Sequence, residues 1–319
     1  MGAMSKPLPF RTLKPFLKES FGRPMYRVAL DAGSSCPNRD GTKGFGGCTY
    51  CDVEGSGTGA LKEGTDLVEQ LEVGLKRIAR RRKKNEAPVG AIAYFQSYSN
   101  TYVDQGRLAE VLDVVTPFLG DTVHAVSVAT RPDCLPDGAI EELRKLAEKV
   151  PVWVELGLES ASDKVLLDIN RLHTLDEFED AVARSHAAGL STVGHAILGL
   201  PGDGREGARR TAEALARAGC AGVKVHNLMI LQRTQMATQW KRGELEVLEP
   251  PTYVEWLADF VERLGPEQVL HRITGESPQE EQLAPRWDVY KTEIRERLVA
   301  TLEARGTEQG SHYTPQQAS

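Results

Sequence analysis

The chain has 319 residues, of which 40% are hydrophobic, 26% charged and 6% aromatic. Such a composition is typical of a globular protein with one large core and an accessory element. There are 39 lysines and arginines against 45 aspartates and glutamates, so the net charge of −6 excludes adhesion to nucleic acids or membranes through net charge alone. The sequence contains no run of 18 apolar residues. We therefore expect no membrane-spanning helix and no membrane partner.

The N-terminus and the cysteines both indicate a reducing compartment. The chain starts with Met1-Gly2-Ala3-Met4, which lacks the apolar stretch of a secretory signal and resembles a cloning scar. Five cysteines, three of them clustered, are too few for a disulfide framework in a chain of this length. We therefore expect a cytoplasmic protein.

Short β-rich apolar runs alternate with segments of helical spacing along most of the chain. The runs begin near Met25, Gly90, Val123, Val152, Leu190 and Val223. Before the fifth run, Thr174 and Glu177 match a capping box that marks the start of a helix. Six strand–helix units predict an α/β fold with a parallel sheet covered by helices, either doubly wound or an incomplete (β/α) barrel. Functional side chains are then expected just after each strand, because active sites of both architectures lie there.

The pattern changes after Gln232. Helices are expected from Thr252 to Leu264 and from Asp288 to Ala304, with a proline-containing segment between them. The predicted organisation is an N-terminal extension (1–22), a core (23–235), a C-terminal helical extension packed on the core (236–305), and a polar, aperiodic tail predicted to be disordered (306–319).

A cysteine cluster follows the first predicted strand. Cys36, Cys48 and Cys51 lie within 16 residues, and the last two have a spacing that lets both thiolates face one metal or cluster. Three thiolates with no evident fourth favour a [4Fe–4S] cluster with one open iron, because structural zinc usually takes four protein ligands. Zinc completed by Cys134 or a distant histidine, and redox or incidental thiols, are the alternatives. Cys134 and Cys220 are otherwise expected in the core or in loops.

Several further motifs accompany the cysteines. They are Cys36-Pro37-Asn38-Arg39-Asp40-Gly41, Tyr50 before the last cysteine, Tyr94-Phe95-Gln96, Thr130-Arg131-Pro132-Asp133, Glu155-Leu156-Gly157-Leu158-Glu159-Ser160, Asn170-Arg171, Gly199-Leu200-Pro201-Gly202, His271-Arg272 and Arg305-Gly306-Thr307. As a set they resemble the radical S-adenosylmethionine (SAM) superfamily. Eleven residues separate the first two cysteines, where the family usually has three. That departure resembles the YhcC/YtqA-like subgroup, which is similar to the Elongator catalytic subunit and to coproporphyrinogen dehydrogenase.

The resemblance implies a partial (β/α)6 TIM-type barrel of the radical SAM type, with a C-terminal helical extension. It implies a [4Fe–4S] cluster on Cys36, Cys48 and Cys51, with SAM bound to the open iron through its amino and carboxylate groups. An electron from a donor such as flavodoxin or ferredoxin would cleave SAM, and the resulting 5′-deoxyadenosyl radical would abstract hydrogen from a substrate carbon. The protein's part is positioning and electrostatics.

The resemblance also implies contacts for the cofactor and the substrate. Gln96 is expected at the methionine end of SAM, Arg171 at its carboxylate, and Glu159 at the ribose. The remaining candidates for the cofactor are Tyr50, His195, Ile197 and Leu228, and those for the substrate are Asn100 and His226. Glu159 and Arg171 are alternatively a structural ion pair. Ile197 and Leu228 are core residues in any interpretation, and the two histidines are alternatively satisfied core residues.

The substrate is suggested by two weaker features. Arg80, Arg81 and Arg82, followed by two lysines, end the first predicted helix, where basic side chains suit the helix dipole or contact phosphates. Similarity to the Elongator subunit favours tRNA, with modification of the C5 substituent of a wobble uridine. The alternatives are a radical SAM enzyme for a small metabolite and a non-enzymatic iron–sulfur or zinc protein that regulates a partner.

Overall fold

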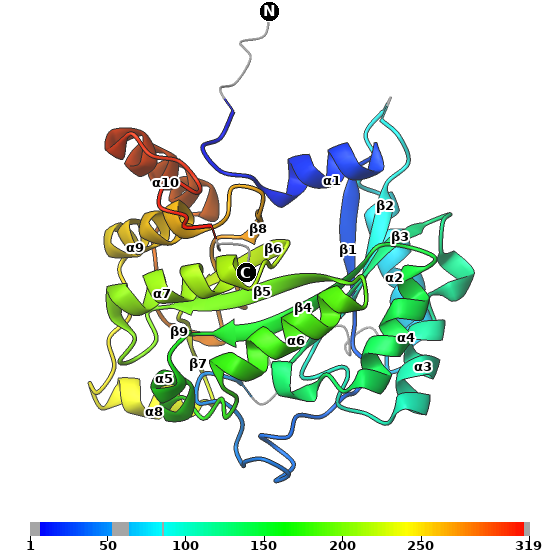
Figure 1. Ribbon diagram of the computed structural model, residues 1–319, viewed down its shortest axis with the longest axis horizontal. Helices are drawn as coiled ribbons and strands as arrows, with labels where there is room; N and C mark the ends of the chain where they lie inside the picture. The colour runs from blue at the N-terminus through cyan, green and yellow to red at the C-terminus, as the bar shows by residue number, and fades with distance from the viewer. Residues whose placement is uncertain (1–6, 53–63, 85, 316–319) are drawn as a thin grey trace, which may run out of the picture.

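The computed structural model describes residues 7–52, 64–84 and 86–315, and its centre is a parallel sheet curled into a half-barrel (Figure 1). The strand order is β1-β2-β3-β4-β5-β6-β8, and every neighbouring pair is parallel. The strands are β1 (Met25–Leu30), β2 (Gly90–Phe95), β3 (Val123–Thr130), β4 (Val152–Glu159), β5 (Ser191–Leu198), β6 (Gly222–Asn227) and β8 (Val269–Arg272). The predicted partial barrel is confirmed.

The seventh strand corrects the predicted organisation. β8 lies within the segment assigned to a helical extension, yet it pairs with β6 and continues the sheet. Because it has four residues and follows a helix and a turn, its apolar signal was too short to separate from its surroundings. Residues beyond 235 therefore complete the barrel as well as covering it.

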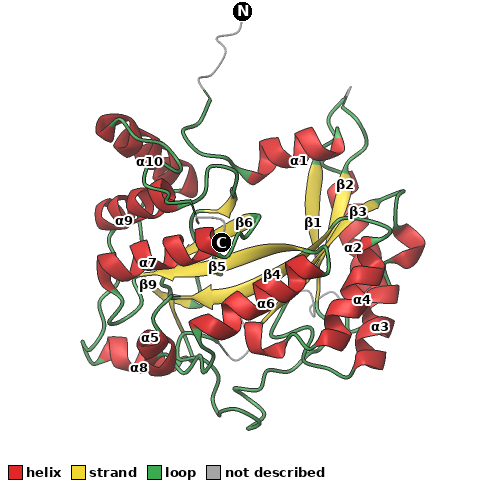
Figure 2. Cartoon of the chain, viewed as in Figure 1, coloured by secondary structure: helices red, strands yellow, loops and turns green. Residues whose placement is uncertain are grey.

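Helices cover the convex face of the sheet (Figure 2). They are α2 (Leu67–Ala79), α3 (Gln105–Asp113), α4 (Asp137–Ala147), α6 (Leu175–Ala187) and α7 (Gly204–Arg217), with the short α5 (Asp163–Asp168) and the 3₁₀ turns η2 (Thr116–Phe118) and η3 (Pro132–Cys134) between them. β2 and β4 are buried along their whole length, as expected for parallel strands covered on both faces. The predicted capping box is confirmed: Thr174 Oγ1 accepts from the Glu177 backbone N–H at 3.2 Å, and the Glu177 carboxylate accepts from the Thr174 N–H at 2.8 Å.

An apolar plug closes the amino-terminal end of the half-barrel. Helix α1 (Leu13–Phe21) places Leu17 in a cluster with the inward-facing Ile92, Trp153 and Val193. These residues lie near the starts of their strands, so the helix seals the end of the barrel opposite the strand carboxyl ends. The interior above the plug is consequently reached from the carboxyl end.

The C-terminal segment packs on the last units of the barrel. Its elements are β7 (Ile230–Leu231), α8 (Gln235–Lys241), α9 (Pro250–Arg263), β9 (Gln282–Ala284) and α10 (Lys291–Arg305), of which β7 and β9 form a small antiparallel sheet. The two predicted helices are thus present as α9 and α10. Helix α9 packs on α7, and α10 packs on α9.

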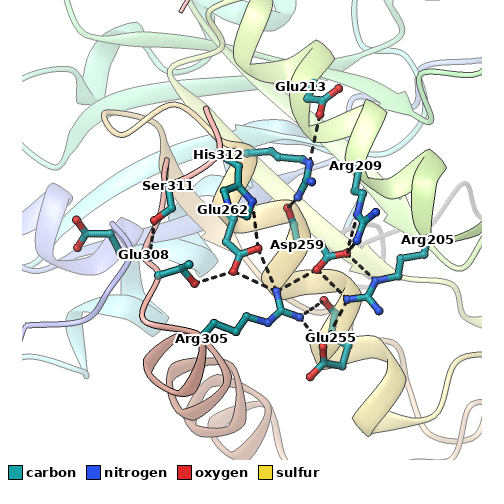
Figure 3. A network of polar contacts seen from close by, with 12 residues as sticks. Arg205, Arg209, Glu213, Glu255, Asp259, Glu262, Arg305, Glu308, Ser311 and His312 are labelled. Atoms are coloured by element: carbon teal, nitrogen blue, oxygen red, sulfur yellow. Dashed lines mark hydrogen bonds and ion pairs between the residues drawn. The ribbon is translucent and has the colours of Figure 1, made fainter. Parts of the chain in front are cut away.

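A polar network fastens α10 to the two helices beneath it (Figure 3). Arg305 Nη1 donates to Asp259 Oδ1 and to Glu262 Oε2, both at 3.0 Å. Arg205 and Arg209 reach the same Asp259 carboxylate from α7, with Nε–Oδ2 distances of 2.6 and 2.8 Å. One buried carboxylate therefore connects α7, α9 and α10.

The segment after α10 is ordered where the structure describes it, contrary to the disorder predicted for residues 306–319. Gln309 is buried, and its Nε2 donates to the Gly265 and Gln268 carbonyls at 2.7 Å. Thr307 Oγ1 donates to the Glu262 carboxylate at 2.6 Å. Polar residues here satisfy buried partners on α9 and its following turn, which composition alone does not reveal. Residues 316–319 lie outside the described residues.

Candidate active site

A cavity of about 650 Å³ opens at the carboxyl ends of the strands. Its volume lies in the range of small-molecule and cofactor sites. The predicted site residues that line it are Cys36, Cys48, Tyr50, Cys51, Gln96, Glu159, Arg171, His195, Ile197, His226 and Leu228. Residues distant in sequence thus meet where the strand–helix pattern predicted a site.

The cysteine loop is folded around the Asn38 side chain. The backbone carbonyl of Asn38 accepts a hydrogen bond from the Gly47 N–H at 2.8 Å. The side-chain Nδ2 of Asn38 donates to the Arg171 carbonyl at 3.2 Å. Gly47 has a φ of +76°, and a Cβ there would come within 3.1 Å of the Arg39 guanidinium. A glycine is therefore required for the turn that brings Cys48 back to Cys36.

Hydrogen-bond donors lie near the sulfurs of two of the three cysteines. Arg39 Nη2 lies 3.5 Å from Cys51 Sγ, Arg171 Nη1 lies 3.8 Å from Cys48 Sγ, and Asn38 Nδ2 lies 3.7 Å from the same sulfur. Burial, together with the Cys48 thiol, raises the pKa of the Cys51 thiol to about 11 in the absence of metal. Cationic and amide donors aimed at sulfur suit thiolates bound to an iron–sulfur cluster.

The arrangement of the three cysteines bears on the choice between a cluster and a lone zinc ion. Among the described residues, no three His, Cys, Asp or Glu side chains are arranged to hold a single metal ion. Zinc would need its ligands to converge at about 2.3 Å from one point, whereas a four-iron cluster spreads its cysteines around a larger body. Cys134, the suggested fourth zinc ligand, is buried in η3, with its Sγ 3.9 Å from Asp133 Oδ1.

Arg171 joins the cysteine loop to the end of β4. Its Nη2 donates to the Gly157 carbonyl at 2.9 Å and lies 3.5 Å from Glu159 Oε1, while its Nε is buried with no hydrogen-bond partner in the described part of the chain. Arg131 holds its backbone, donating to the Arg171 carbonyl at 2.7 Å. Glu159 has a φ of +71°, a strained conformation often found at functional sites. The ion pair foreseen as an alternative is present and lines the cavity.

The comparisons with known proteins agree with this geometry. The model of the radical SAM superfamily matches residues 36–215, and that of the radical SAM C-terminal domain matches residues 220–304. The chain belongs to the radical SAM superfamily. It is a radical SAM enzyme, and the cofactors of this family are a [4Fe–4S] cluster and SAM.

Individual relatives cover most of the chain. YtqA of Bacillus subtilis is 38% identical over 304 residues, which are 95% of this chain and 92% of YtqA. YhcC of Escherichia coli is 32% identical over 272 residues, 85% of either chain. The structure of Elp3 from Methanocaldococcus infernus shares the fold, with a TM-score of 0.66 at 15% identity, and covers 90% of this chain and 64% of the Elp3 chain. None of the helices described for this radical SAM enzyme combines the length and the apolar character that a membrane span requires.

Two histidines stack inside the cavity of the radical SAM enzyme. The ring centroids of His195 and His226 are 5.9 Å apart, and His195 Nε2 lies 3.0 Å from Glu155 Oε2. His226 Nε2 is buried and has no hydrogen-bond partner in the described part of the structure. Burial lowers the pKa of both rings, and Arg272 lowers that of His226 further. Ile197 and Leu228 form a buried apolar wall beside them.

Two groups of predicted substrate-binding residues lie outside the cavity. Asn100 does not line the cavity; its Nδ2 donates to the Ala129 carbonyl at 2.9 Å and the Phe95 carbonyl at 3.2 Å, so it joins the ends of β2 and β3. The basic run Arg80, Arg81 and Arg82 follows α2 and precedes β2, with Arg81 5.1 Å from the ring of Tyr26 near the start of β1. The run is therefore exposed at the amino-terminal end of the barrel, opposite the cavity.

A polar layer in the barrel interior was not predicted as a unit, although Tyr94, Glu155 and Arg272 belong to motifs noted in the sequence. It consists of Arg27, Tyr94, Glu155, Lys224 and Arg272, all lining the cavity. Glu155 is fully satisfied: Ser127 donates to its Oε1 at 2.6 Å, and His195 and Lys224 contact its Oε2. At each of these positions except Tyr94, a charged residue lies in an otherwise apolar strand. Such a residue in a buried strand was the sequence feature that could have indicated the layer.

Proposed function

We propose that Cys36, Cys48 and Cys51 hold the [4Fe–4S] cluster and that the cavity beside them receives SAM. When bound, these groups supply a 5′-deoxyadenosyl radical that abstracts hydrogen from the substrate. Arg39 and Asn38 would stabilise the anionic sulfurs by hydrogen bonding, as their distances to Cys51 and Cys48 allow. A small electron-transfer protein such as flavodoxin or ferredoxin would deliver the electron.

Arg171 is the residue we propose for the SAM carboxylate. Its unpartnered Nε is buried at the cysteine end of the cavity, and a guanidinium can bind a carboxylate through two parallel hydrogen bonds. Glu159 lines the cavity next to it and has an oxygen available for ribose hydroxyls. Gln96 and Tyr50 lie at the same end, while Ile197 and Leu228 supply an apolar wall for the adenine.

We further propose that the substrate is a tRNA and that the reaction modifies the C5 substituent of a wobble uridine. Over 123 residues, 38% of this chain, it is 26% identical to a protein of Methanocaldococcus jannaschii named tRNA uridine(34) acetyltransferase, of which the match covers 22%. This similarity is the observation that carries the proposal. It is supported by the cavity of about 650 Å³, which is large enough for an extruded base. Arg80 to Arg82 have no role at that base, because they lie at the opposite end.

The proposal is tested by comparing the nucleosides of tRNA from cells with and without the gene. We expect one modified uridine to disappear and its precursor to accumulate, and re-expression of the gene to restore the profile. The Cys48→Ala variant serves as a matched control that should not restore it. An unchanged nucleoside profile would contradict the tRNA substrate and favour a small metabolite, without affecting the assignment to the radical SAM superfamily.

A further inference from the structure

The polar layer carries more positive than negative charge. Arg27 and Lys224 lie next to Glu155, and Arg272 lines the same cavity; Glu155 is the carboxylate of this layer among the described residues. Glu155 contacts Lys224 directly, whereas Arg27 lies 4.0 Å from it. Burial, together with the charges of Arg27 and Arg272, lowers the pKa of Lys224 to about 7 against the attraction of Glu155. The layer is thus an electropositive environment in which further cations are disfavoured.

Donors in this layer lack partners. The half-buried side chain of Arg272 lines the cavity and makes no hydrogen bond or ion pair within the described residues. Arg27 Nε and His226 Nε2 are buried and also have no hydrogen-bond partner there. Two of the other cavity carboxylates have cations of their own: Glu159 pairs with Arg171, and Glu276 accepts from Lys291 at 2.7 Å. The third, Glu281, lies next to β9 in the segment that follows β8. Buried unpartnered donors next to excess positive charge are costly unless an anion completes them.

Strand register places these groups on the floor of the cavity. Lys224 is the register partner of both His195 on β5 and Arg272 on β8, so the three residues lie at one level across three adjacent strands. Ile197 and His226 form the next level toward the carboxyl ends. The polar layer consequently lies deeper than the cysteine loop, which follows the end of β1.

We propose that the cavity floor binds a carboxylate borne by the substrate base, with Arg272 as its principal partner and Arg27 and His226 as additional donors. This inference rests on the proposed function and names a chemical group on the base that reacts. SAM's own carboxylate is assigned to Arg171 at the cysteine end, so the floor is left for the substrate. A backbone phosphate stays at the mouth when a base is extruded, whereas a substituent of the base reaches deepest.

The first test identifies the nucleoside that accumulates in tRNA from cells lacking the gene. Treatment with acidic methanol should convert it to a methyl ester, with the mass gain of one methylene group, because only a carboxylic acid esterifies under these conditions. Re-expression of Arg272→Gln should lower conversion by about tenfold or more, since a charge-assisted hydrogen bond is lost. Arg272→Lys should restore part of it, and the exposed Arg295→Gln should behave as the unaltered protein.

The outcomes separate the two proposals. If the accumulating nucleoside has no carboxylate, the proposal that the cavity floor binds a substrate carboxylate is overturned, and the tRNA proposal is left intact. Full conversion by Arg272→Gln also overturns it. If no tRNA nucleoside changes, the tRNA proposal fails. Carboxylate binding at the cavity floor is then tested on the purified, reconstituted protein.

That second test compares thermal unfolding in sodium acetate, sodium phosphate and sodium chloride at equal ionic strength, with saturating SAM present so that Arg171 is already occupied. Acetate should raise the Tm of the unaltered protein above its value in chloride, because a ligand that binds the folded state stabilises it. The gain should be absent in Arg272→Gln and present in Arg295→Gln. Equal responses in acetate and chloride, or a gain confined to phosphate, would overturn a carboxylate site.

Discussion

Glu155 on β4 and Lys224 on β6 form an ion pair across the barrel interior, with side chains that are 1% and 3% exposed. Lys224 also donates to the Tyr94 hydroxyl at 3.0 Å, and its Nζ lies 4.4 Å from the centre of that ring. Burying two charges costs desolvation energy, which their attraction and additional hydrogen bonds offset only while both partners are present. The burial of either charge is therefore tolerated only while the other is present.

Removal of one partner should cost more than removal of both charges. We expect Lys224→Met to lower the free energy of unfolding by about 3–5 kcal/mol, because it leaves the Glu155 charge buried without its cation. The double variant Glu155→Gln/Lys224→Met should lose less than Lys224→Met alone. Denaturant unfolding of the three proteins measures this. A double variant less stable than the single one would show that the pair stabilises through packing rather than charge compensation.

Replacement of any cluster cysteine should abolish cluster assembly. After anaerobic reconstitution, Cys36→Ala, Cys48→Ala and Cys51→Ala should each contain little iron and sulfide and lack the brown absorbance of a [4Fe–4S] cluster. The matched control is Cys134→Ala, which removes a buried thiol outside the cysteine loop and should retain the cluster. Tightly bound zinc in the unaltered protein, lost in Cys134→Ala, would instead support the zinc alternative.

Two roles of Arg171 and Glu159 can be distinguished: contacts to SAM, and an ion pair that only stabilises the fold. We expect Arg171→Met to weaken SAM binding by about tenfold or more, since a bidentate contact to a carboxylate is lost. Arg171→Lys should recover only part of the affinity, because an ammonium lacks the planar fork. Equilibrium binding of SAM to the reconstituted variants gives the result. If Arg171→Met and Glu159→Gln lower the Tm equally while SAM affinity is unchanged, the pair is structural.

The features that were predictable from the sequence are those encoded locally. The six longer strands are segments of six to eight residues in which apolar residues predominate, and the spacing of Cys36, Cys48 and Cys51 indicates a shared ligand. The capping box at Thr174 is likewise contained within four residues. Local patterns of this kind predict the same element whichever distant segments pack against it.

The features that were missed depend on partners far along the chain. Glu155 and Lys224 are 69 residues apart, and nothing near either residue indicates the other. Asn100 has the polar character of a ligand contact, yet three backbone carbonyls use its amide. Gln309 belongs to a polar tail by composition, but buried carbonyls at Gly265 and Gln268 hold it. Burial decides these roles, and burial is a property of the assembled fold.

The Asp259 carboxylate should make stability depend on pH. Burial opposes its ionisation, but hydrogen bonds from Arg205, Arg209 and Arg305 hold the pKa of this carboxyl well below its usual value of 3.8. As the pH falls through 3.8, the unfolded chain takes up a proton at this position before the folded protein does. The stabilisation is therefore complete above that pH and is lost as the pH falls toward the lowered pKa of the folded state.

Asp259→Asn measures this contribution. At pH 7 we expect the variant to lose about 1–3 kcal/mol in free energy of unfolding, because hydrogen bonds to a charged group are removed from α7 and α10. The difference from the unaltered protein should shrink below pH 3.8, where the unfolded chain no longer carries the charge. Asp180→Asn is the matched control, since Asp180 is largely exposed and forms an ion pair within one helix, and it should change stability little. A difference that stays constant from pH 7 to pH 3 would mean that Asp259 acts through shape and not through its charge.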